Sequence, residues 1–366
     1  MNIPLFKVYM SKKVDDPLLK TIHSGWIGQG EKVKEFEQAL QDRIKNPYCL
    51  TLASGTHGLH LALRLAGVGF GDEVITSPLT CTATNWPILM QGAVPIWADV
   101  KDDMNIDPNS IRKLVTDRTK AIMTIHWGGY PCDMREIKDI SVDYQVPIIE
   151  DAAHAFGSRY RHTNIGSCSY SDFTMFSFQA IKSLTSVDGG ALFCNKGDDY
   201  KRGKLLRWYG IDRESPRTDF RCEEDILEWG YKYHMNDINA SIGLVNLEEV
   251  DWVIDTARKN AAYYDEALKN IDGIRIVQSD PEKISSYWLY TILVENRAEF
   301  MYLLGSHGIG VSRVHERNDK HTCTKQFKRD LPNLEEVIKK HISIPVGWWV
   351  TEEDREYIIS TIKKGW

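Results

Sequence analysis

The stretch Val146–His154 reads V-P-I-I-E-D-A-A-H and joins a short apolar run to two consecutive acidic residues. The apolar run predicts a buried strand of a parallel sheet. Its polar end, Glu150-Asp151 with His154 close behind, would lie at the carboxyl edge of the sheet, where open α/β sheets bind ligands. Two interpretations stay open for Asp151. It forms a salt bridge or helix cap, or it holds a proton on a bound heteroaromatic nitrogen.

Similar short apolar runs lie on both sides of this one, separated by helical stretches. They cover residues 48–53, 73–76, 94–98, 121–125, 172–178 and 191–194. This alternation predicts an α/β fold with a mainly parallel sheet between helices.

The texture of the chain changes after a long helical pattern that begins near Asn236 and runs towards Leu268. Strands at 273–277 and 287–294, with helices near 298–307 and 352–363, indicate a smaller α+β unit. We therefore expect a large domain of residues 1–250 and a small domain of residues 251–366. The polar residues 212–228 should form an excursion from the sheet.

Composition excludes several classes of protein. Of the 366 residues, 42% are hydrophobic and 26% are charged, which excludes intrinsic disorder, and the net charge of −6 gives no global attraction to nucleic acid or anionic membrane. The seven cysteines contain no C-x-x-C pair, so we expect neither a disulfide framework nor a metal site. No apolar run of about 18 residues predicts a membrane span. Without a signal-peptide pattern at the N-terminus, we expect a cytoplasmic protein.

The residues Ser54-Gly55-Thr56 follow one predicted strand and begin a helix whose apolar face includes Leu59, Ala62 and Leu63. Free N–H groups and the helix dipole at such a point favour phosphate. A plain N-cap explains the same residues. The chain has no nucleotide P-loop motif.

Lys182 lies among apolar and small residues in F-S-F-Q-A-I-K, residues 176–182. A desolvated lysine has a lowered pKa and attacks carbonyl groups as a free amine, whereas most lysines are solvated surface charges. Together, a phosphate site, a buried Asp and a partly buried Lys are the parts needed to bind pyridoxal phosphate.

These motifs, in this order, resemble the DegT/StrS-type nucleotide-sugar aminotransferases, a branch of the fold-type-I pyridoxal-phosphate enzymes. The resemblance covers roughly residues 20 to 245, and it rests on S-G-W-I-G-Q-G (24–30), Phe36-Glu37, S-G-T (54–56), G-D-E-V-I (71–75), T-K-A-I (119–122), E-D-A-A-H-A (150–155), S-F-x-x-x-K (177–182) and Gly189-Gly190.

The resemblance implies a role for each matching residue. Lys182 would form the Schiff base with pyridoxal 5'-phosphate and later move a proton between substrate and cofactor, which alternates with its pyridoxamine form. Asp151 would keep the pyridinium nitrogen protonated. Gly55, Thr56 and Ser177 would bind the cofactor phosphate, and His154 would lie near its ring.

The family works as homodimers with shared active sites, and the segment that reaches the partner would be Gly230–Asp237. Lys232 and His234 stand there in place of the usual Asn and Arg, and which of them reaches the phosphate stays open. Cys81 stands where an aromatic residue usually stacks on the cofactor, with Trp86 as the alternative.

The resemblance also implies an amino-acid donor, L-glutamate, and a nucleotide-linked 4-keto or 3-keto deoxy sugar as acceptor, in surface-polysaccharide or glycan sugar biosynthesis. Our candidates for substrate contact are Gly28, His126, Arg313 and His315, although the charged loop at 311–321 is also typical of a solvated surface. A sugar or base could stack on Trp127, Trp348 or Trp349. The alternatives are a dehydratase-type relative, in which His replaces the lysine, and a non-enzymatic scaffold or regulator.

Overall fold

A seven-stranded sheet with the order β1-β9-β8-β5-β4-β2-β3 is the centre of the computed structural model, which describes residues 2–216, 225–278 and 280–366. All neighbouring strands pair in parallel except at β9, which is antiparallel to both β1 and β8. The predicted α/β fold with a mainly parallel sheet is confirmed. The strands are β1 (Cys49–Leu52), β2 (Glu73–Thr76), β3 (Val94–Trp97), β4 (Thr119–Ile125), β5 (Ile148–Asp151), β8 (Phe173–Ser177) and β9 (Gly190–Cys194).

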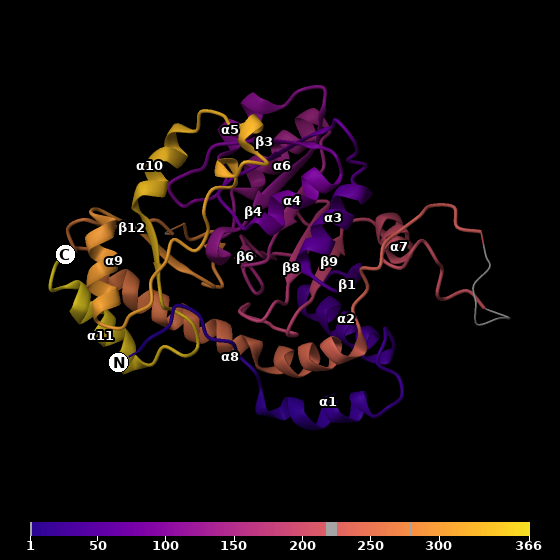
Figure 1. Cartoon of the computed structure of the whole chain (residues 1–366), viewed down its shortest axis with the longest axis horizontal. Helices are drawn as coiled ribbons and strands as arrows, with labels where there is room; N and C mark the ends of the chain where they lie inside the picture. Colours follow the sequence, from indigo (N-terminus) through magenta and orange to yellow (C-terminus); the bar gives the residue numbers. More distant parts are fainter. Residues whose placement is uncertain (1, 217–224, 279) are drawn as a thin grey trace.

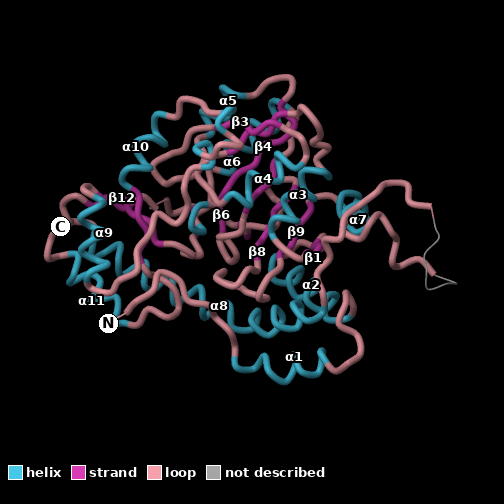
Figure 2. The backbone as a smooth tube through the Cα atoms, in the orientation of Figure 1, coloured by secondary structure: helices cyan, strands magenta, loops and turns pink. Residues whose placement is uncertain are grey.

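Helices cover both faces of this sheet, because its strands are apolar on both sides (Figure 2). Ile122 of β4 and Ile148 of β5 pack into one buried cluster, and their neighbours Met123 and Ile149 pack into the other. The surrounding helices are α2 (Glu31–Ile44), α3 (Gly55–Leu65), α4 (Thr82–Met90), α5 (Pro108–Leu114), α6 (Met134–Tyr144) and α7 (Gly197–Leu206).

The long helix α8 (Asp237–Leu268) runs past the sheet, with α1 (Asp15–Ile22) alongside it, to the C-terminal elements (Figure 1). There an antiparallel sheet of three strands packs with helices in a separate buried cluster. Its strands are β10 (Ile274–Ile276), β12 (Tyr290–Val294) and β13 (His341–Ile344), and the helices of this region are α9 (Arg297–Ser306), α10 (Pro332–Lys340) and α11 (Glu352–Ile362).

The remaining short elements connect the two parts of the chain. β11 (Lys283–Ile284) pairs with β6 (Arg159–Tyr160), which also pairs with β7 (Thr163–Asn164). Chain beyond residue 250 therefore returns to the first part, and the domain boundary near 250 stays a prediction. Short 3-10 helices cover Lys12–Val14, Trp127–Gly129, Asn318–Lys320 and Lys325–Phe327. Of the expected excursion at 212–228, residues 217–224 lie outside the described residues.

Within the described ranges, no helix combines the length and the apolar character that crossing a bilayer requires.

A buried ion pair fixes the strand that leads into the Ser54-Gly55-Thr56 turn. Glu37 of α2 is only 8% exposed and pairs with Arg207, just after α7. The Glu37 carboxylate accepts hydrogen bonds from the backbone N–H and the hydroxyl of Thr51, at 2.8 and 2.9 Å. Arg207 donates to the Thr51 carbonyl at 3.0 Å. Helices α2 and α7 are thereby locked to β1.

We predict that Glu37→Ala lowers the free energy of unfolding by about 3–5 kcal/mol, because it leaves the Arg207 charge buried without its partner. Urea denaturation followed by circular dichroism measures this loss. The matched control is Glu35→Ala on the same helix, whose exposed pair with Lys32 should contribute only about 0–1 kcal/mol. Equal losses in the two variants would contradict the assignment.

Candidate active site at the carboxyl edge of the sheet

The carboxyl ends of the parallel strands bring the predicted site residues to one edge. Asp151 ends β5 and Ser177 ends the adjacent strand β8, while Gly55 begins α3 directly after β1. Cys81 lies beyond β2 at the N-cap position of α4. This is the edge at which open α/β sheets bind their ligands.

The Asp151 carboxylate is buried, with 5% of the residue exposed. Burial raises the pKa of Asp151, while a hydrogen bond from Thr84, the N–H of Ala153 and the nearby positive charge of Lys182 lower it. The hydrogen bonds from Thr84 and Ala153 and the charge of Lys182 therefore favour the charged form of this buried carboxylate.

The Lys182 amine lies close to that carboxylate and is desolvated. Burial lowers the pKa of Lys182 to about 8, although the nearby side chains of Asp151 and Cys81 act in the opposite direction. Its Nζ lies 3.7 Å from the centroid of the Trp288 ring. A lysine in this state supplies an appreciable fraction of neutral, nucleophilic amine at neutral pH.

Two glycines form a cradle around the start of α3. A Cβ atom at Gly55 would lie 2.9 Å from the Met175 sulfur and 3.1 Å from the Ser177 Cβ, and one at Gly190 would lie 2.8 Å from the Gly55 nitrogen. The first N–H groups of a helix have no partner within it, so this close-packed turn offers donors to an anion. Ser54 also caps the helix, because its hydroxyl oxygen accepts the His57 N–H at 3.2 Å, so the N-cap interpretation is observed and phosphate binding stays a prediction.

Parallel rings form one wall beside Lys182. His154 stacks on Trp288 with centroids 3.8 Å apart, and the rings of His154 and His315 lie 5.4 Å apart and nearly parallel. Burial and the Lys182 charge keep the pKa of His154 well below its usual value and lower that of His315 to about 3. Both histidines are therefore uncharged at neutral pH, and the buried Nε2 of His315 has no hydrogen-bond partner among the described residues.

Trp288 is the site residue that the sequence did not reveal. It lies just before β12, where the strand pattern predicts packing and nothing indicates proximity to Lys182. Its indole N–H donates to the carbonyl of Ile181 at 2.8 Å, and Phe6, which precedes α1, stacks on its ring with centroids 5.0 Å apart. Trp127, one of the tryptophans proposed for sugar stacking, is fully buried.

The structure does not support the prediction that His126 contacts the substrate. Its ring is fully buried, with Nε2 2.7 Å from the Glu150 carboxylate and Nδ1 accepting the Cys132 N–H at 3.1 Å. Because both ring nitrogens have protein partners, neither is free for a substrate. His126 supports the strand edge through its backbone N–H, which donates to the Asp151 carbonyl at 3.2 Å.

Gly28 and Arg313, two other predicted substrate contacts, lie at the start of α8 and in a partly exposed ion pair. The Gly28 carbonyl accepts the backbone N–H of Asp237 at 2.8 Å, at the start of α8. Arg313 pairs with Glu316 at 3.3 Å and keeps 43% of its side chain exposed. Trp86, the alternative to Cys81, packs edge-on against His321.

The segment Gly230–Asp237 runs beside the end of β1, since the Ala53 N–H donates to the Tyr233 carbonyl at 2.7 Å. The centroids of the His234 and Trp208 rings lie 3.5 Å apart. Burial and the nearby charge of Arg213 lower the pKa of His234 to about 4. Lys232 is exposed. Of the two predicted phosphate contacts, Lys232 is therefore the exposed one and His234 is partly buried.

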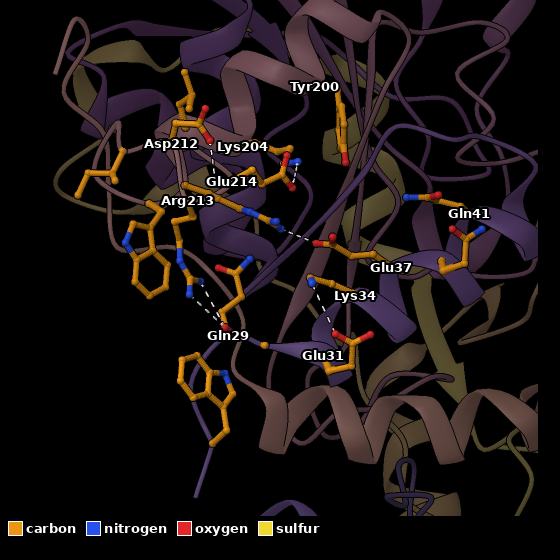
Figure 3. Close-up of a pocket in the computed structure, with 17 residues that line it drawn as sticks. Gln29, Glu31, Lys34, Glu37, Gln41, Tyr200, Lys204, Asp212, Arg213 and Glu214 are labelled. Atoms are coloured by element: carbon orange, nitrogen blue, oxygen red, sulfur yellow. Dashed lines mark hydrogen bonds and ion pairs between the residues drawn. The ribbon is translucent and has the colours of Figure 1, made fainter. Parts of the chain in front are cut away.

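A separate cavity of about 710 Å³ lies between α2, α7 and residues 208–214 (Figure 3). Arg213 donates to the Gln29 carbonyl across it, and Glu37 lines its wall. Neither Lys182 nor Asp151 lines this cavity, so the cavity is separate from the site at the carboxyl edge of the sheet.

The fold and this edge, with a desolvated lysine, a buried aspartate and a glycine-lined helix start, define a pyridoxal-phosphate enzyme of fold type I. The chain belongs to the DegT/DnrJ/EryC1/StrS aminotransferase family, whose model matches residues 9–363. It is a pyridoxal-phosphate-dependent sugar aminotransferase.

Solved structures of sugar aminotransferases are similar over the whole chain. CalS13 from Micromonospora echinospora is 39% identical, with a TM-score of 0.95 and complete coverage of both chains. AtS13 from Actinomadura melliaura is 41% identical, with a TM-score of 0.96, and covers 100% of this chain and 99% of its own. The PLP form of the putative sugar aminotransferase Spr1654 from Streptococcus pneumoniae is 28% identical, with a TM-score of 0.91 and coverage of 100% and 98%. These matches favour the aminotransferase over the dehydratase-type and non-enzymatic alternatives.

We predict that the rate at which the cofactor-free protein takes up pyridoxal phosphate rises with pH through a midpoint near 8. The neutral amine is the nucleophile, and burial lowers the pKa of Lys182 to about 8. Stopped-flow absorbance measures the rate at each pH. Asp151→Asn should move the midpoint lower, since the Asp151 charge raises this pKa.

Two controls accompany this titration. Lys182→Ala should give no visible band, and a free lysine derivative should show a midpoint above about 10. A midpoint for the protein near that of the free amine would contradict the desolvated state of Lys182.

Proposed function

We propose that this aminotransferase moves the amino group of L-glutamate to a nucleotide-linked keto deoxy sugar, in the synthesis of surface-polysaccharide or other glycan sugars. The observation that carries the proposal is the Lys182 amine, desolvated and close to the buried Asp151 carboxylate. When bound, the cofactor supplies a carbonyl group that takes up the donor's amine and a protonated ring that withdraws electrons.

We propose the following roles for this chain's residues. Gly55, Thr56 and Ser177 would hold the cofactor phosphate at the start of α3, and Asp151 would hold the proton on the ring nitrogen. Lys182, with a pKa of about 8, accepts and returns the proton that moves during transfer. The wall of His154, Trp288 and His315 is uncharged and aromatic at neutral pH, and the apolar face of a sugar ring would pack on it.

We also propose a homodimer with shared active sites. Exposed apolar side chains near the segment Gly230–Asp237 support it, since large exposed apolar patches mark interfaces. Trp26 is 61% exposed, Trp229 62% and Leu227 95%. Lys232, exposed on the same segment, would reach the cofactor phosphate of the partner. The cytoplasmic location stays a prediction.

We predict that L-glutamate alone bleaches the visible band of the holoenzyme and releases one equivalent of 2-oxoglutarate per active site. The band should return when a keto nucleotide sugar is added. Absorbance and chromatography of the keto acid check both half-reactions. Lys182→Ala is the control and should lack the first step. A panel of amino acids in which another donor is faster than L-glutamate would overturn the assigned donor.

We predict that mixing two inactive variants restores activity if the sites are shared. Lys182→Ala and Lys232→Ala each damage both sites of their own dimer, but a mixed dimer keeps one intact site. Random pairing of equal amounts makes about half of the dimers mixed, and each mixed dimer has one intact site of its two. The mixture should therefore show about a quarter of wild-type activity. Subunits are exchanged at low concentration and assayed after reassembly. Activity that stays at the level of the separate variants would contradict the shared site.

A further inference from the structure

The Asp151 carboxylate is held by a donor from a different part of the chain. Thr84 of α4 is 1% exposed, and its hydroxyl donates to the Asp151 Oδ2 at 2.6 Å. The other oxygen, Oδ1, accepts the N–H of Ala153 at 3.0 Å. Each carboxylate oxygen has further lone-pair capacity, so these two bonds fix the plane of the group and still leave an acceptor position for a ring N–H.

A second hydroxyl lies behind the first. Thr80 is 2% exposed, and its Oγ1 lies 2.8 Å from the Oγ1 of Thr84. A hydroxyl has one hydrogen, and Thr84 gives its hydrogen to the carboxylate, so Thr80 must be the donor in this contact. The two hydrogen bonds therefore run in one direction, from Thr80 to Thr84 and from Thr84 to Asp151. We call these three residues and their two hydrogen bonds the relay.

The usual reason for a buried threonine hydroxyl in a helix does not apply to Thr84. Such a hydroxyl commonly bonds the backbone carbonyl four residues earlier. Here that residue is Thr80, whose carbonyl instead accepts the Asn318 side chain at 2.8 Å. Asn318 also accepts a hydrogen bond from Asn85 at 2.8 Å, which anchors the turn that carries Thr80.

We propose that Thr84 and Thr80 are positioning residues that hold the Asp151 carboxylate charged and in a fixed orientation towards the ring nitrogen of the cofactor. This inference rests on the proposed role of Asp151. A hydrogen bond to the charged form of a buried carboxylate favours that form. The ionisable groups that act on Asp151 are Lys182, from the segment after β8, and His126, at the end of β4.

The chain supplies a matched control at Thr124. This residue of β4 is fully buried, and its hydroxyl has no hydrogen-bond partner among the described residues. Its Cα lies opposite Glu150 in the register of β4 and β5, next to Asp151. Thr124→Val therefore makes the same chemical change beside Asp151 without touching the hydrogen bonds that join Thr80, Thr84 and Asp151.

The experiment compares the holoenzymes of Thr84→Val, Thr84→Ser, Thr80→Val, Thr124→Val and Asp151→Asn. Two quantities are measured, the dissociation constant of the cofactor and the pH at which its visible absorbance band is half-converted. Thr84→Val should weaken cofactor binding about 10-fold, the effect of one lost charged hydrogen bond. It should also move the absorbance midpoint in the same direction as Asp151→Asn, but less far. Thr84→Ser should restore both quantities, Thr80→Val should give a smaller shift, and Thr124→Val none.

The result that overturns the relay is a midpoint unchanged by Thr84→Val while Asp151→Asn shifts it, because a merely structural threonine would alter only stability. If Thr84→Val does not fold, Thr80→Val carries the same test. A midpoint that Asp151→Asn itself leaves unchanged would instead refute the proposed role of Asp151, and the relay with it.

Discussion

The burial of one carboxylate at the end of β5 is the constraint on which the rest of the site depends. An isolated charge on Asp151 would be expelled from such a place or neutralised. The structure surrounds it instead with the Thr84 hydroxyl, the Ala153 N–H and the charge of Lys182. These groups come from three separate segments, and the sheet order places the ends of β8 and β5 side by side. The strand order of the large sheet thus brings together the charged groups of the site.

Desolvation then sets the protonation states around Lys182. The same burial that raises the pKa of Asp151 lowers those of Lys182, His154 and His315. The histidines lose their charge entirely at neutral pH, whereas the pKa of Lys182 stays near 8 because Asp151 acts on it. One wall is therefore uncharged and aromatic, and the lysine is the group beside it whose proton can move near neutral pH.

The sequence predicts what local patterns encode and fails where distant contacts decide. Apolar runs ending in polar residues predict β5 with Asp151, and the same pattern predicts that Gly55 and Ser177 lie at the same edge of the sheet, where the structure places them. The antiparallel course of β9 is not encoded in its apolar pattern, since buried strands of either direction are alike in sequence. The pairing of His126 with Glu150 and the approach of Trp288 to Lys182 join residues 24 and 106 positions apart. Only the folded chain shows that His126 has no free nitrogen.

The segment that carries Lys182 is a loop between β8 and β9, and a reacting group on a loop needs external support to stay in place. Two contacts supply it, one on each side of Lys182 in the sequence. The Trp288 indole binds the carbonyl of Ile181, and the buried Asn246 amide of α8 binds the carbonyl of Thr185 at 2.8 Å. Asn246 also accepts the N–H of Ser11 at 3.0 Å, while Phe6 packs on Trp288. Ser11 and Phe6, which precede α1, thus contact both supports, so the position of the lysine depends on residues from the first and the last thirds of the chain.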